Sequence, residues 1–254
     1  NSLTLEDVVA VADGGMTVAL SDEAHPRMQA SRDLVERWVR DNKVMYGITT
    51  GFGEFSNVHI GKDKLADLQR NLIISHAVGC GDPIPKHITR ILMLLRANAL
   101  AKGHSGIRIS TVEHLLAMLN ADIIPVIPSQ GSVGSSGDLV QLAHLVCGMM
   151  GLEHCWSDDC DLRPSAEALA AAGLSPVVLS AKEGLALING TQMMTAYLTW
   201  TTARAKALMR MADISGAMTL EGLLGTTNAC DPLLHTVRPH PGQQAAARNV
   251  LRLL

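Results

Sequence analysis

The stretch from Val177 to Asp231 contains no proline and few charged side chains. Proline ends most helices that it enters, because it lacks an amide hydrogen and clashes with the preceding turn. From residue 191 to about residue 226 apolar side chains occupy most helical faces, which indicates burial on many sides. The stretch therefore predicts consecutive helices inside a bundle or a subunit interface, and it restricts the chain to a mainly α fold.

Shorter helices are predicted before and after this stretch, because apolar residues recur there three and four positions apart. We expect them over residues 5–12, 26–41, 61–78, 87–102, from Ser110 onward, over 165–172 and over 243–254. Ser110 and Glu113 have the spacing of a capping box. A short strand is expected at Val44. The expected domains are an N-terminal helical lobe with short strands and site-bearing loops, residues 1–180, and the start of a long helical bundle, residues 181–254.

Composition excludes several classes of protein. A chain of 254 residues that is 47% hydrophobic can bury a sizeable core in one or two domains. A net charge of −3 and an aromatic content of 3% give no basis for binding nucleic acid. No uncharged apolar run has the length of a membrane span, and the five cysteines are scattered, as in a reducing compartment. We expect a cytoplasmic protein that binds neither nucleic acid nor membranes.

Residues 129–144 are the part of the chain richest in small residues, Ser-Gln-Gly-Ser-Val-Gly-Ser-Ser-Gly-Asp-Leu-Val-Gln-Leu-Ala-His. In a sharply bent loop the Gly137 amide nitrogen can attack the carbonyl carbon of Ser135, and loss of water closes a five-membered ring. Loss of a second water from the Ser136 side chain leaves an exocyclic methylidene, which is a strong electrophile. A plainer interpretation is a loop that ends in an N-capped helix.

Segment 131–139, here called the triplet loop, resembles the prosthetic-group loop of the aromatic amino-acid ammonia-lyases. The family pattern is Gly-Ser-Val-Gly-Ala-Ser-Gly-Asp-Leu, and this chain departs from it only at Ser135, which replaces alanine. In that family the triplet cyclises autocatalytically to methylidene-imidazolone (MIO). The resemblance implies that Ser135, Ser136 and Gly137 form MIO here, with the Ser135 side chain only decorating the ring.

Residues 46–53, Tyr-Gly-Ile-Thr-Thr-Gly-Phe-Gly, resemble the family's inner loop. The resemblance implies that Tyr46 is the catalytic base, for which nearby positive charge or hydrogen-bond donors must lower the tyrosine pKa. The glycines of this loop are consistent with a lid. From the residues alone, a tight turn with a half-buried Tyr46 is the alternative.

Two further segments carry the resemblance. Residues 68–79, here called the selectivity segment, end in Ser75-His76-Ala-Val-Gly and are similar to those of family members that act on histidine. The resemblance implies that His76 binds the substrate imidazole, whereas periodicity alone also allows a core histidine bonded to a backbone carbonyl. Residues 182–192 match a signature whose asparagine, Asn189, lies beside the prosthetic group. The plainer interpretation of Asn189 is the end of a helix. We expect Arg96 and Arg108 to be surface or capping groups.

The resemblance implies a carbon–nitrogen lyase that eliminates ammonia from L-histidine to give trans-urocanate. It also implies a homotetramer whose active sites combine residues from three chains. The family's later Gln-Asp-x-Tyr-Ser-x-Arg segment does not occur here, so we expect the N-terminal half of such an enzyme, which needs the C-terminal half for a complete site. Two alternatives stay open, a phenylalanine- or tyrosine-type lyase or aminomutase and an inactive helical oligomerisation fragment.

Residues 154–160 contain two cysteines, a histidine and two aspartates. Structural zinc sites usually pair their cysteines two residues apart and add a second cluster of ligands. Neither feature occurs here, so the sequence predicts no metal site.

Overall fold

The computed structural model describes residues 3–53, 60–61, 64–157 and 161–254. Within these residues the chain is mainly helical with short strands, which confirms the expected fold class. The elements in chain order are α1 (Leu5–Ala12), η1 (Asp22–Ala24), α2 (His25–Arg40), α3 (Leu65–His76), β1 (Cys80–Pro83), α4 (Lys86–Leu100), α5 (Ile109–Asn120), β2 (Pro128–Gln130), α6 (Leu139–Met149), β3 (His154–Trp156), β4 (Leu162–Pro164), α7 (Ser165–Ala171), α8 (Glu183–Ile188), α9 (Gln192–Gly222), η4 (Asn228–Cys230), α10 (Pro232–Val237) and α11 (Pro241–Leu253).

The chain divides into two compact units, Asn1–Thr199 and Trp200–Leu254. Helix α9 begins in the first unit and continues into the second. Helix α8 packs against α3 and α6, so it belongs to the first unit. The boundary expected after residue 180 concerns the domains of a longer protein and stays a prediction.

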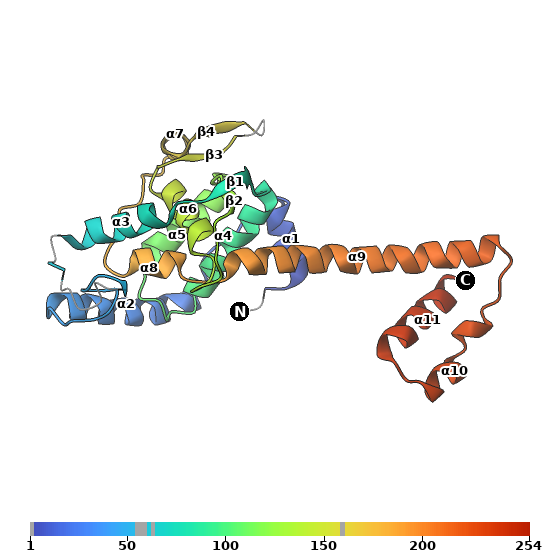
Figure 1. Ribbon diagram of the computed structural model, residues 1–254. Helices are drawn as coiled ribbons and strands as arrows, with labels where there is room; N and C mark the ends of the chain where they lie inside the picture. Colours follow the sequence, from blue (N-terminus) through green and yellow to red (C-terminus); the bar gives the residue numbers. More distant parts are fainter. Residues whose placement is uncertain (1–2, 54–59, 62–63, 158–160) are drawn as a thin grey trace. The chain divides into compact units, whose positions relative to one another are not determined.

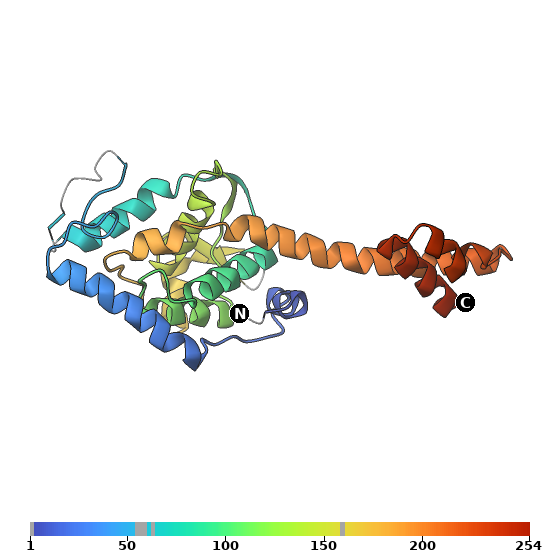
Figure 2. The same ribbon diagram turned by 90° about the horizontal axis from the view of Figure 1, so that it is seen from below.

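Helices α4, α5 and α6 form the centre of the first unit (Figures 1 and 2). Their apolar stripes bury Leu92 on α4, Leu115 on α5 and Leu142 and Leu145 on α6 without measurable exposure. Burying one such side chain contributes about 1.5–3 kcal/mol to folding. Of the residues that the apolar spacing of 87–102 predicts to face inward, Ile88, Ile91 and Leu92 are buried, whereas Leu95 and Ala99 are only half-buried.

Two antiparallel strand pairs occur in the described residues. Strands β1 and β2 pair with Cys80 opposite Gln130, and β3 pairs with β4 to form a hairpin that precedes α7 (Figure 1). Because β1 follows α3 and β2 leads into the triplet loop, the first pair joins the selectivity segment directly to that loop.

The second unit contains the later part of α9 and helices α10 and α11, which lie side by side in Figure 1. Asn249 on α11 donates a 2.7 Å hydrogen bond to Asp213 on α9. Several apolar side chains of α9 are exposed in the single chain, namely Met194, Leu198, Leu208, Met209, Met211 and Met218. Burial of this helix in a bundle or an interface therefore stays a prediction. No helix in the described part of the chain is long and apolar enough to cross a bilayer.

Two local predictions were wrong. Residues 44–49 contain turns instead of a strand, because Thr49 draws the backbone back on itself by bonding to Met45 N and Lys43 O. Helix α5 begins at Ile109 with Arg108 as its N-cap, so Ser110 is already inside the helix and no capping box forms. Glu113 instead lies 4.0 Å from His25.

The acidic and cysteine-containing segment that was considered for metal binding falls partly outside the described residues. Asp158, Asp159 and Cys160 lie outside the described residues. The described residues contain no group of three or more potential metal ligands.

Candidate active site

The triplet loop is bent at several residues. Gly131, Gly134 and Gly137 have φ of 138°, 72° and 94°, and Ser136 has φ of 60°. A residue with a Cβ atom pays roughly 1–2 kcal/mol in this left-handed region. The central residue of the triplet is therefore held in an unfavourable backbone conformation. Ser135 and Ser136 are both exposed to solvent.

Gly137 lies directly against Gly190, in the turn between α8 and α9. The two residues form an isolated parallel bridge, and Asp138 donates its backbone N–H to Gly190 O at 2.7 Å. A Cβ atom on Gly137 would lie 2.0 Å from the same oxygen, so no larger residue fits. This contact places Asn189, the neighbour of Gly190, beside the triplet.

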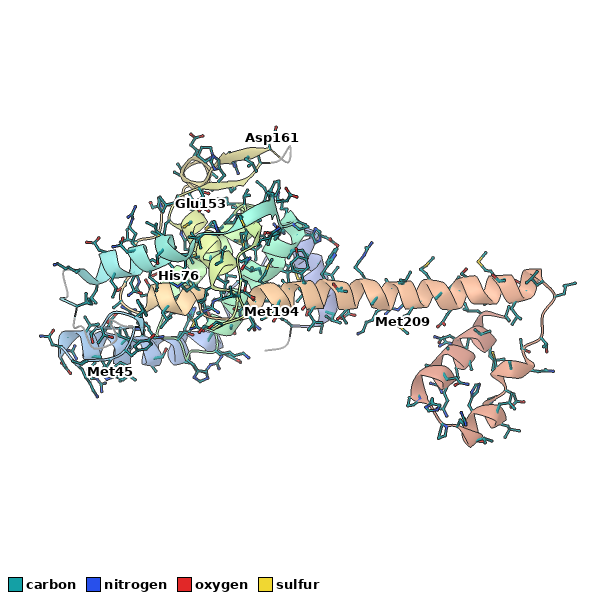
Figure 3. All side chains as sticks on the ribbon, viewed as in Figure 1. Met45, His76, Glu153, Asp161, Met194 and Met209 are labelled. Carbon is teal, nitrogen blue, oxygen red and sulfur yellow. The ribbon has the colours of Figure 1, made fainter. Side chains whose placement is uncertain are left out.

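Asp138 connects the triplet loop to the start of α9. Its carboxylate is buried, and Oδ2 accepts a 3.1 Å hydrogen bond from Met194 N in the first turn of α9 (Figure 3 labels Met194). Asp138 is also the N-cap residue of α6, but its side chain makes no capping bond there. A carboxylate at a helix N-terminus is favourable because the free backbone N–H groups point toward it.

Asn189 is the C-cap of α8, as its helix-ending interpretation predicted, and its side chain is exposed. Lys182 is the N-cap residue at the other end of α8. Its φ of 74° lies in the left-handed region, although the residue has a Cβ atom. Burial lowers the Lys182 pKa, and the charge of Arg96 lowers it further.

Arg96 bonds to residues on both sides of the turn between α8 and α9, and its burial corrects the expected surface position. It is buried on α4, donates to Gln192 Oε1 at 2.7 Å, and also bonds the carbonyl oxygen of Ala186. A Cβ atom on Gly190 would lie 2.3 Å from Arg96 Nη1. Burial lowers the Arg96 pKa to about 10. The sequence did carry a signal for this role, because Arg96 falls within the apolar stripe of its helix. A charged side chain at such a position is rarely buried unless it has polar partners.

Arg108 was also expected to be a surface or capping group. It is the N-cap residue of α5, and it makes an ion pair in addition. Its guanidinium pairs with the fully buried carboxylate of Glu183 at 2.6 Å, and hydrogen bonds to Glu183 raise the Arg108 pKa. Glu183 is the first residue of α8, so this ion pair fixes the start of the helix that carries Asn189.

Tyr46 lies on the surface of the first unit, with 59% of its area exposed. The tight turn of the alternative interpretation is present at 46–49, but its half-buried Tyr46 is wrong. Its ring contacts Phe52 edge to face, with centroids 6.0 Å apart. A Cβ atom on Gly47 would lie 3.0 Å from Leu185 Cδ2, so the loop contacts α8. Figure 3 labels Met45 in the same loop.

His76 is the last residue of α3 and is half-buried (labelled in Figure 3). Its Nδ1 lies 2.8 Å from the Leu72 carbonyl oxygen and 3.1 Å from Ser75 Oγ. A carbonyl oxygen only accepts, so Nδ1 carries the hydrogen and Nε2 is an acceptor. Within the described residues Nε2 makes no hydrogen bond, which leaves it available to a ligand.

The predicted site residues come from four segments: the Tyr46 loop, the selectivity segment, the triplet loop and residues 182–192. Each segment contacts at least one of the others. Asn189 reaches the triplet through Gly190, the Tyr46 loop touches α8 at Leu185, and the selectivity segment meets the triplet loop where β1 pairs with β2. All of them belong to the first unit. The triplet loop fits a cyclised Ser-Ser-Gly, since its backbone is bent and its third residue must be glycine.

Comparisons with known proteins support one family. A family model described as aromatic amino acid lyase matches residues 3–254. The histidine ammonia-lyase of Alkaliphilus metalliredigens is 51% identical over all of this chain and 50% of its own length. The crystal structure of histidine ammonia-lyase from Trypanosoma cruzi is 40% identical with a TM-score of 0.93, over 99% of this chain and 49% of that one.

A tyrosine aminomutase from Streptomyces globisporus has a similar structure. It is 37% identical with a TM-score of 0.91, over 98% of this chain and 47% of that one. The chain therefore spans about half the length of the relatives that it matches.

Proposed function

The chain belongs to the aromatic amino acid lyase family, and from this we propose that the whole protein eliminates ammonia from L-histidine to give trans-urocanate. The observation that carries the proposal is the contact between Gly137 and Gly190, which requires glycine in the triplet and brings Asn189 to it.

We propose that the Gly137 nitrogen attacks the Ser135 carbonyl carbon and that one water leaves as the ring closes. A second water leaves with the Ser136 hydroxyl and the Ser136 Cα hydrogen, which gives the exocyclic double bond. The bent backbone supports this step, because φ of 60° at Ser136 and 94° at Gly137 already compacts the loop. When formed, MIO supplies an electrophile for the amine or the imidazole of the substrate.

The chain's own side chains have three proposed roles. The Tyr46 phenolate takes up the β-proton of the substrate and becomes the neutral phenol, and the exposure of Tyr46 leaves it accessible. His76 accepts a hydrogen bond at Nε2 from the substrate imidazole N–H, and Asn189 orients the substrate beside the triplet. Burying an imidazole N–H without a partner would cost about 1–3 kcal/mol, so the acceptor at His76 favours histidine over phenylalanine.

A tyrosine-type activity is the second candidate, because a tyrosine hydroxyl can also donate to His76 Nε2 and a tyrosine aminomutase shares the fold. Turnover of histidine and of tyrosine by the wild type separates the candidates, and His76→Phe tests whether Nε2 binds the substrate. If histidine is the substrate, this variant loses about tenfold or more in kcat/KM for histidine, since one acceptor to a buried donor is removed. Turnover of tyrosine instead of histidine by the wild type would contradict the proposal.

We also propose a cytoplasmic homo-oligomer, a tetramer by family resemblance, whose site is completed by the second half of the protein. The exposed apolar side chains of α9 support an interface. The cysteines Cys80, Cys147, Cys155 and Cys230 are free, in keeping with a reducing compartment.

The test uses the full natural protein. Intact mass spectrometry should show a deficit of two waters relative to the encoded chain, and urocanate should accumulate with ammonia when L-histidine is added. Ser136→Ala should abolish both results, whereas Ser129→Ala, in the neighbouring strand β2, should keep both. A wild-type protein with the full encoded mass and no release of ammonia would overturn the proposal.

A further inference from the structure

His144 lies on α6, the helix that follows the triplet loop, and no role has yet been assigned to it. Its side chain is buried, with the residue 6% exposed. Buried histidines are usually bonded at both nitrogens, and the identity of the partners shows what the residue holds in place.

Both ring nitrogens of His144 are engaged. Gly79 donates its backbone N–H to Nε2 at 2.9 Å, so Nε2 carries no hydrogen. Nδ1 then carries it and donates to Glu153 Oε2 at 2.9 Å. Glu153 therefore selects the one neutral tautomer of His144 that can accept from Gly79.

Gly79 is the last residue of the selectivity segment, and it is wedged between His144 and the entrance to the triplet loop. A Cβ atom on Gly79 would lie 2.8 Å from His144 Nε2, 3.0 Å from Pro128 Cβ and 3.2 Å from Gln130 O. A Cβ atom on Gly131 would in turn lie 3.3 Å from Gly79 Cα. A shift of Gly79 would therefore change how the selectivity segment meets the triplet loop.

The backbone of Glu153 adds a second observation. It has φ of 60°, an unfavourable conformation for a residue with a Cβ atom. This conformation follows Gly151, which has φ of 72°, so the chain turns back after α6 and the Glu153 carboxylate reaches His144.

We propose that His144, oriented by Glu153, is a positioning residue that holds the end of the selectivity segment against the triplet loop and so sets the place of His76 relative to the triplet. The inference rests on the proposed function of this site. His144 acts through Gly79 and does not itself contact the substrate.

The test compares His144→Leu, which removes the acceptor, with His144→Gln, whose side-chain oxygen can replace it. In the full natural protein His144→Leu should raise KM for histidine about three- to tenfold, as expected for one lost hydrogen bond, with kcat within about twofold. His144→Gln should restore KM to within about twofold of the wild type. His114→Leu is the matched control, because this partly buried histidine lies on α5 and should leave KM unchanged.

Hydrogen exchange gives a readout that is independent of activity. The peptide that contains Gly79 should exchange about three- to tenfold faster in His144→Leu and should return toward the wild-type rate in His144→Gln. Where His144→Leu does not fold, Glu153→Asn replaces it. Asparagine tolerates the left-handed conformation but is too short to reach Nδ1. We therefore expect a smaller rise in KM and a smaller increase in the exchange rate at Gly79.

The inference is overturned if His144→Leu folds, shows the mass deficit of two waters, and has unchanged KM and an unchanged hydrogen-exchange rate at Gly79. Equal losses in His144→Leu and His144→Gln also overturn it, because a merely structural histidine would not be rescued by an acceptor. A wild-type protein that forms no urocanate refutes the proposed function instead, and this result is seen before any variant is compared.

Discussion

Glu183 lies at the start of α8, and its fully buried carboxylate accepts five hydrogen bonds. The donors are Arg108 N at 3.1 Å, Arg108 Nε at 3.0 Å, Arg108 Nη2 at 2.6 Å, Thr111 Oγ1 at 2.7 Å and Ser180 N at 2.7 Å. Every partner is a donor, so the site requires two accepting oxygens. Glu183→Gln keeps the shape of the side chain and removes one of them.

The expected loss in the free energy of unfolding follows from these partners. In either orientation the glutamine NH2 group faces N–H or O–H donors, and the Arg108 charge loses its counter-ion. Breaking a buried ion pair by removing one partner costs about 3–5 kcal/mol. The Arg108 side chain is 37% exposed and can turn toward water, so we expect a loss near the lower end, about 3 kcal/mol.

The assay is urea unfolding of the full natural protein at fixed concentration, followed by circular dichroism. The midpoint should fall while the m-value stays constant, because the surface exposed on unfolding is unchanged. Glu36→Gln is the control. Glu36 pairs with Arg32 at 2.9 Å, but its side chain is 56% exposed, so its loss should cost at most about 0.5 kcal/mol. A Glu183→Gln variant as stable as this control would refute the reasoning.

Gly137→Ala should keep the full encoded mass and lower ammonia release about a hundredfold or more. The reason is that the added Cβ atom would lie 2.0 Å from Gly190 O. A variant whose mass shows the loss of two waters would contradict this prediction. Asp138→Ala should cost about 1–2 kcal/mol in urea unfolding, because the first turn of α9 loses its acceptor, and an unchanged midpoint would be evidence against that cap. Burial raises the pKa of Cys147 to about 12, so N-ethylmaleimide at about pH 8 should label exposed Cys80 and spare Cys147 in the native protein, as peptide mass mapping would show. The unfolded chain loses the Cys147 proton first as pH rises from 9.0 toward about 12, so the free energy of unfolding should fall over that window.

Local patterns predicted the helices well. Helix α1 has the predicted bounds, 5–12, and α7 ends one residue before the predicted 172. These signals are short-range, because apolar spacing and the glycines and prolines that end helices act within a few residues. The same approach failed at Ser110, where the capping pattern is present but Arg108 already has the extended conformation of an N-cap.

The sequence by itself determined the chemistry that the chain can offer. A Ser-Ser-Gly triplet in a glycine-rich loop, a tyrosine in a second such loop and a histidine at a helix end are visible in the order of residues alone. Together these motifs resemble one family, and this resemblance predicted the mainly α fold, the lyase family and the candidate site residues.

Only the tertiary structure decided how these residues are supported. Arg108 meets Glu183 across 75 positions of sequence, and Gly79 meets His144 across 65. No periodicity encodes such contacts, because they depend on which helix faces pack together after the local elements have formed. For the same reason Gly190, which looks like an ordinary end of a helix, became the residue that requires glycine at position 137.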